Sequence, residues 1–184
     1  MSARIPLVLI PGTLCDAALW RHQIDHLGDI ADVSVADHAR HESMAAIARA
    51  ILVAAPPRFA LAGLSMGGFV AFEIMRLAPE RVDRLALFDT SARPDAPEMI
   101  QRRHDLTKLT HVGQFKGVTP RLLPSFIPPD RLNDEALCRT ITEMAERVGP
   151  DAFVRQQTAN AARPDSRPDL ARIACPTLVA CGRQ

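Results

Sequence analysis

Residues 58–77 read RFALAGLSMGGFVAFEIMRL and carry the clearest structural signal in the chain. Its first part, residues 58–64, is a short apolar run typical of a strand that is buried on both faces of a parallel sheet. Its last part, residues 69–77, is rich in apolar residues and ends before Pro79, which predicts a helix. The chain is therefore expected to pass from strand to helix through a turn of only a few residues.

That turn, Gly63-Leu64-Ser65-Met66-Gly67, matches the pattern G-x-S-x-G. A serine on so sharp a corner has a strained backbone, so the residues two before and two after it must be small, as Gly63 and Gly67 are. The start of the helix also directs N–H groups and positive charge toward Ser65, which favours an oxyanion there. We predict that Ser65 is a nucleophile. A second interpretation stays open, in which Ser65 caps the helix and the glycines only permit close packing.

Strand and helix patterns alternate around this turn. A helix capped by Asp16 should stop at Gly28, and another should span residues 43–54 before Pro56-Pro57. Such alternation predicts an α/β fold with a mostly parallel sheet flanked by helices. The other expected strands are residues 5–10, 32–36, 84–88 and 177–181.

Residues 95–163 have a different character, with helical patterns interrupted by glycines and prolines and without strand-like alternation. We interpret them as an inserted helical lid. The expected organisation is a core in residues 1–94, a lid in residues 95–165 and a return to the core in residues 166–184.

A second motif, Pro11-Gly12-Thr13-Leu14, follows the first strand. Stabilising a tetrahedral intermediate needs two preorganised donors, one from the residue after the nucleophile and one from a loop after an earlier strand. We predict the N–H groups of Met66 and Thr13 as the oxyanion hole, with Leu14 as the reserve donor. A plain strand-to-helix turn would explain Pro-Gly equally well.

Four segments together resemble the α/β-hydrolase superfamily in its compact, lid-bearing esterase and lactonase branch. They are LVLIPGTLCDAALW (7–20), GLSMGG (63–68), LALFDT (85–90) and RPDLARIACPTLVACGR (167–183). The resemblance implies that Ser65 is the nucleophile, that Thr13 and Met66 form the oxyanion hole, and that the inserted helices cover the pocket. Relatives often carry His-Gly where this chain has Pro11-Gly12.

The catalytic triad of this superfamily runs serine, acid, histidine along the chain. The acid usually follows the strand expected at residues 177–181, and this sequence ends at Gln184. We therefore expect that the last strand or strands, the last helix and the catalytic histidine are missing. Asp89 is a reserve candidate for the acid, because it follows the strand at residues 84–88. The favoured interpretation is that Asp89 caps its turn or helps to hold neighbouring loops.

The six histidines of this chain are expected to lie outside a site. His22 and His26 have the four-residue spacing of half a zinc site, but a solvated helix face is favoured. Surface exposure is also expected for the other four, His38, His41, His104 and His111. We predict neither a metal nor an organic cofactor.

Composition narrows the choice of partner. A net charge of +1, with acids and bases interspersed, provides no field for collecting nucleic acid or anionic lipid. The apolar run at residues 5–10 is too short for a signal peptide or a membrane span, and the four cysteines form no C-x-x-C pair. We expect a cytoplasmic protein with reduced thiols that acts on a small molecule.

Two functions follow from these patterns. The first is a serine hydrolase that acts on a small ester, lactone or thioester through an acyl-enzyme on Ser65. The second is a catalytically inactive fragment, or a remnant that binds acyl compounds, because the base is absent. Nucleotide binding fares worse, since GLSMGG is not G-x-G-x-x-G and no lysine follows as in a P-loop. The last strand, an exposed apolar edge, is expected to promote self-association.

Overall fold

The computed structural model describes residues 4–183 and contains one parallel five-stranded sheet in the order β2-β1-β3-β4-β5. The strands are β1 (Ile5–Ile10), β2 (Ala31–Val35), β3 (Phe59–Leu64), β4 (Val82–Phe88) and β5 (Thr177–Ala180). Every strand that the sequence predicts is present, with ends that differ by at most two residues. The α/β prediction with a mostly parallel sheet is therefore confirmed.

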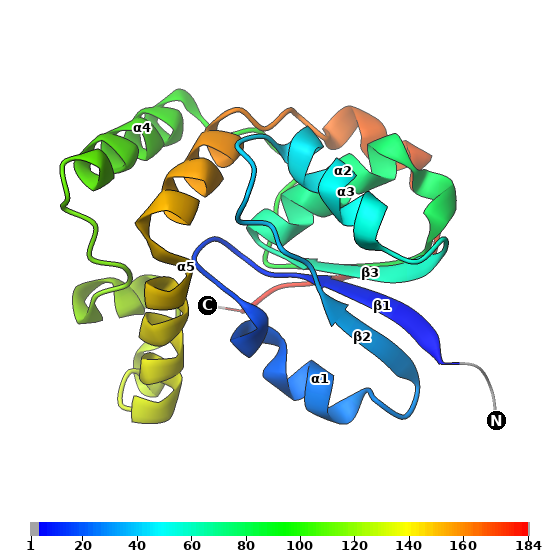
Figure 1. Cartoon of the computed structure of the whole chain (residues 1–184), viewed down its shortest axis with the longest axis horizontal. Coiled ribbons are helices and arrows are strands. Elements are labelled where there is room, and N and C mark those ends of the chain that lie inside the picture. Colours follow the sequence, from blue (N-terminus) through cyan, green and yellow to red (C-terminus); the bar gives the residue numbers. More distant parts are fainter. Residues whose placement is uncertain (1–3, 184) are drawn as a thin grey trace.

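Helices cover both faces of the sheet (Figure 1). A 3-10 helix (Ala17–Trp20) and α1 (Arg21–His26) lie on one face, and α2 (Met44–Ala54) and α3 (Met66–Leu77) lie on the other. Asp16 is a cap as expected, because it accepts from the Ala18 N–H at 2.9 Å. Ser43 also proves to be a cap, because it accepts from the Ala46 N–H at 3.2 Å and α2 begins one residue later.

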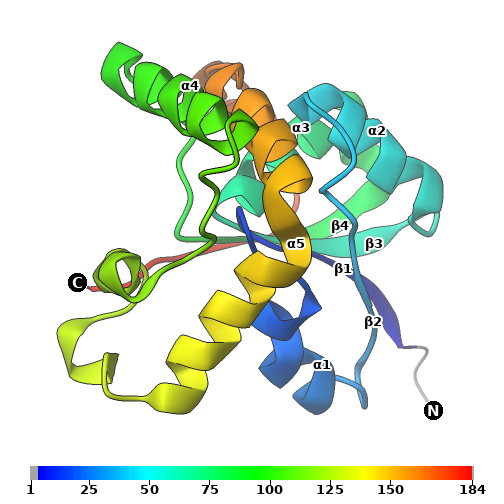
Figure 2. The same cartoon turned by 60° about the vertical axis from the view of Figure 1, so that its left-hand side comes forward.

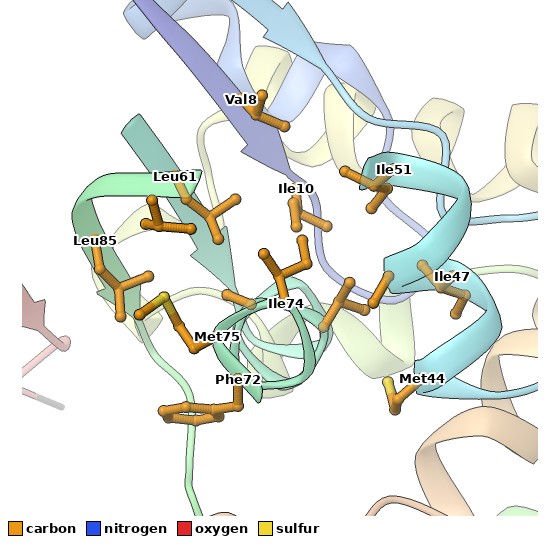
Figure 3. Close-up of a cluster of buried hydrophobic side chains, with 14 of the residues drawn as sticks. Val8, Ile10, Met44, Ile47, Ile51, Leu61, Phe72, Ile74, Met75 and Leu85 are labelled. Atoms are coloured by element: carbon orange, nitrogen blue, oxygen red, sulfur yellow. The ribbon is translucent and has the colours of Figure 1, made fainter. Parts of the chain in front are cut away.

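The side chains of β1 alternate between two cores. Val8 and Ile10 pack with α2 and α3 in the larger core (Figure 3). Leu9 points to the opposite face and packs with Trp20 in the smaller one. Burial on both faces explains why the central strands read as continuous apolar runs.

The segment between β4 and β5 contains α4 (Pro97–His111) and α5 (Glu135–Ala161), with short 3-10 helices at Pro120–Ser125 and Pro129–Arg131. A further 3-10 helix, Arg167–Arg172, leads to β5. The long α5 changes direction at Gly149, whose φ of 75° suits glycine, and Pro150 follows (Figure 2). Its second half, residues 150–161, lies beside the core.

An ion pair closes the base of this helical segment. The buried Asp95 carboxylate contacts the Arg163 guanidinium at 2.7 Å, and it also accepts from Arg103 of α4. The two ends of the segment therefore leave and re-enter the core at the same place. The guanidinium of Arg163 also lies 4.0 Å from the centroid of the Phe69 ring on α3.

The edge strand β5 differs from the buried pattern that its sequence suggests. Leu178 is 55% exposed and Val179 is 72% exposed, because no described segment covers this edge of the sheet. Within residues 4–183, no helix combines the length and the apolarity needed to cross a membrane.

Candidate active site

The backbone of Ser65 is the most unusual feature of the corner between β3 and α3. Its φ of 52° and ψ of −111° lie in a region that residues with a Cβ rarely adopt. The neighbouring atoms fix this conformation, because the Ser65 N–H donates to the Phe88 carbonyl at 2.9 Å and the Thr90 hydroxyl donates to the Ser65 carbonyl at 2.7 Å. Ser65 as a whole residue is half-buried.

The positions of Gly63 and Gly67 leave no room for a side chain. A Cβ on Gly63 would lie 2.7 Å from the Gly68 nitrogen, and a Cβ on Gly67 would lie 2.8 Å from the Pro11 carbonyl oxygen. Both distances are shorter than real Cβ contacts, and both clashes are with backbone, which cannot move aside. The helix α3 begins at Met66 rather than at Phe69 as the sequence suggested, since Gly67 and Gly68 are already helical.

The loop of residues 11–14 lies against this corner. A Cβ on Gly12 would lie 3.6 Å from the Ser65 Cβ, which shows how closely the two turns approach. The Thr13 hydroxyl lies 3.6 Å from the Met66 sulfur. Among residues 4–183, neither the Thr13 N–H nor the Met66 N–H has a hydrogen-bond acceptor. Two free amide donors therefore belong to the two turns that meet at Ser65.

Leu14 is not available as the reserve donor. Its N–H donates to the buried Gln156 Oε1 of α5 at 3.0 Å. Its backbone has a φ of 59°, and its side chain packs among the residues of the helical segment, including Phe153. The expectation that Leu14 could replace Thr13 is therefore wrong in this conformation.

Asp89 follows β4 and also has a positive φ, of 41°. Its Oδ1 accepts from the Gly182 N–H at 2.8 Å, and its own N–H donates to the Ala180 carbonyl at 3.0 Å. Both contacts hold the chain just after β5. This geometry favours the interpretation in which Asp89 holds a neighbouring loop over that of the triad acid.

The structure corrects the expectation for His38, which is only 3% exposed. Its Nε2 lies 2.9 Å from the Gly12 carbonyl oxygen and 3.1 Å from Gln156 Nε2. Because a carbonyl only accepts, the contact with Gly12 calls for the proton on Nε2. Burial lowers the pKa of His38 below 6.5, although the Gly12 hydrogen bond and the Asp37 charge oppose this shift.

The other histidines lie on the surface or close to it. His22 and His26 are exposed and stack with their ring centroids 4.2 Å apart. Among the described residues, no histidine hydrogen-bonds to the Ser65 hydroxyl. Two surface hollows, of about 570 Å³ along α4 and about 480 Å³ beside Asp16, have linings that do not include Ser65.

Sequence reasoning missed Gln156 and Asn160, which α5 places against the loop of residues 11–14. Both are buried, and the Asn160 amide donates to the Thr13 hydroxyl at 3.0 Å. The sequence offered one signal, two amide side chains four residues apart and therefore on one face of a helix.

A strained serine between a parallel strand and a helix, in this strand order, is the arrangement of the α/β-hydrolase fold. An esterase from Thermogutta terrifontis has 27% sequence identity and superposes with a TM-score of 0.83 over 97% of this chain and 71% of that chain. The enol-lactonase from Burkholderia xenovorans LB400 has 21% identity and a TM-score of 0.85 over 100% of this chain and 74% of that chain. The chain has the α/β-hydrolase fold, and the resemblance to this superfamily is confirmed.

Sequence comparison agrees with the fold. A protein of Azorhizobium caulinodans that carries the name carbamate hydrolase RutD is 27% identical to this chain. The 199-residue alignment covers 99% of this chain and 74% of that protein. No protein-family model matches the sequence. The chain's relatives are thus hydrolases.

Proposed function

We propose that the chain carries the nucleophile and the oxyanion hole of a serine hydrolase that acts on a small ester, lactone or thioester. The observation that carries this proposal is the strained Ser65 at the start of α3, next to the loop that holds Thr13. The names of the relatives, an esterase and an enol-lactonase among them, support acyl transfer as the reaction class.

In the proposed reaction, the Ser65 Oγ attacks the acyl carbon and loses its proton to a general base. The carbonyl oxygen becomes an oxyanion that accepts hydrogen bonds from the Thr13 and Met66 N–H groups. Collapse of the intermediate expels the alcohol or thiol and leaves an acyl-enzyme, which water then hydrolyses. The base in this scheme is a histidine. Among the described residues, no histidine hydrogen-bonds to Ser65. The residues between Asp95 and Arg163 would cover the acyl group as a lid.

A second candidate is binding of acyl compounds without turnover. It is favoured by one observation, the absence of any described histidine that hydrogen-bonds to Ser65. Losing the base costs several orders of magnitude in rate, because a serine hydroxyl is a weak nucleophile at its own pKa.

Turnover of p-nitrophenyl acetate, a δ-lactone and an acyl thioester by the purified chain tests both candidates. The first candidate predicts that at least one of the three is hydrolysed and that Ser65→Ala abolishes this turnover. Ser91→Ala is the matched control, because Ser91 is exposed and accepts only from the Arg93 N–H in its own turn. Equal rates in wild type and Ser65→Ala contradict the serine mechanism. Saturable binding without any turnover supports the second candidate.

A further inference from the structure

The Leu14 backbone needs an explanation, because a bulky residue with φ of 59° is conformationally strained. Such a conformation persists only where the surroundings hold it. Two contacts do so here. The Leu14 N–H donates to Gln156 Oε1 at 3.0 Å, and the Leu14 side chain is buried in the cluster that contains Phe153. Gln156 and Phe153 both belong to the second half of α5, and the rest of the cluster comes from other parts of the helical segment.

The next residue toward Ser65 is held from the same helix. Asn160 Nδ2 donates to the Thr13 hydroxyl at 3.0 Å, and this hydroxyl in turn lies 3.6 Å from the Met66 sulfur. Asn160 Oδ1 has no partner among the described residues, so the bond to Thr13 is the side chain's one described hydrogen bond. The amides of Gln156 and Asn160 are one helical turn apart and therefore share a face of α5.

Both amides are buried, so the loss of either hydrogen bond would leave an unpaired polar group. Gln156 is 0% exposed and Asn160 is 1% exposed, so neither can exchange its protein partner for water. Removing Gln156 Oε1 would leave the Leu14 N–H buried and unpaired. The strained turn at Leu14 would then relax, and the Thr13 N–H one residue away would move with it.

We propose that Gln156 and Asn160 are positioning residues of the oxyanion hole, an inference that rests on the proposed function. They hold Leu14 and Thr13 so that the Thr13 N–H stays free and directed at the acyl oxygen on Ser65. The helical segment between β4 and β5 thus does more than cover the site. Its last half-helix sets the geometry of one of the two oxyanion donors.

Gln156→Met tests this inference, because methionine keeps the length of the side chain and removes the acceptor. Gln157→Met is the matched control. Gln157 is also buried on α5, but its Oε1 accepts from Arg103 at 2.7 Å and not from the oxyanion loop. The first readout is the second-order rate constant for labelling of Ser65 by a small alkyl fluorophosphonate, whose phosphoryl oxygen occupies the oxyanion hole. The second is the amide ¹H–¹⁵N spectrum of the chain before it reacts with the fluorophosphonate.

We expect Gln156→Met to lower the labelling rate constant by about tenfold or more, since complete loss of one oxyanion donor costs about a hundredfold to a thousandfold. Gln157→Met should label within about twofold of wild type. The amide signals of Thr13 and Leu14 should shift in Gln156→Met and stay in place in Gln157→Met.

Two failures can be told apart. The positioning role is overturned if the two methionine variants label at equal rates, or if the Thr13 and Leu14 signals do not move in Gln156→Met. The proposed function survives that result as long as labelling still depends on Ser65. Labelling that persists in Ser65→Ala, or that is absent from the wild-type chain, contradicts the proposed function and the oxyanion role with it.

Discussion

Gly67→Ala should be among the most damaging small substitutions in this chain. The new Cβ would lie 2.8 Å from the Pro11 carbonyl oxygen and closer still to that of Ile10. Both are backbone atoms at the end of β1, so the clash can be relieved only by moving α3 away from the sheet. Overpacking typically costs about 1–3 kcal/mol, and a rigid backbone clash lies at the upper end, near 3 kcal/mol. A typical domain has a stability of about 5–15 kcal/mol, so this loss is large.

Urea unfolding followed by the fluorescence of Trp20, the single tryptophan, measures this loss. Gly28→Ala is the matched control, because a Cβ there meets nothing within 4 Å. It should leave the free energy of unfolding unchanged or raise it by up to about 1 kcal/mol, by restricting the unfolded chain. The reasoning is refuted if Gly67→Ala unfolds at the same urea concentration as Gly28→Ala.

Three further predictions concern charge and the sheet edge. Burial lowers the pKa of His38, so the folded chain keeps it neutral while the unfolded chain takes up a proton below pH 6.5. Stability is thus complete above pH 6.5 and should fall by up to about 1.4 kcal/mol per pH unit below it. In His38→Asn, the free energy of unfolding in urea should lack this slope between pH 7 and pH 5. An unchanged slope contradicts the explanation that buried His38 causes it. Asp95→Asn should lower the free energy of unfolding by about 3 kcal/mol, because it leaves Arg163 buried without its charge partner; a loss below about 1 kcal/mol would count against it. The exposed edge of β5 should make the 184-residue chain self-associate in sedimentation velocity, and Val179→Lys should reduce this, whereas a monomeric wild type argues against edge pairing.

The positions of the strands along the chain and the serine corner could be predicted because their signals are local. The apolar run of β3, the glycines around Ser65 and the apolar residues of α3 stand next to one another in the chain. The packing requirement at Gly63 and Gly67 is also local, so the motif carries its own physical reason.

The surroundings of the loop at residues 11–14 could not be predicted, because they depend on distant parts of the chain. His38 reads as a surface histidine in a turn, yet it is buried beside Gln156, which lies 118 residues further along the chain. The positive φ of Leu14 has no signature in the sequence. It becomes intelligible only when the second half of α5 is placed against the loop.

The central claim is that the Ser65 oxygen is the group that attacks an acyl or phosphoryl centre. The most direct measurement is peptide mapping by mass spectrometry after treatment of the 184-residue chain with a fluorophosphonate. The account predicts one added phosphonyl group, on the peptide that contains Ser65, and none in Ser65→Ala. An added group on another residue, or the same added mass in Ser65→Ala, would contradict it.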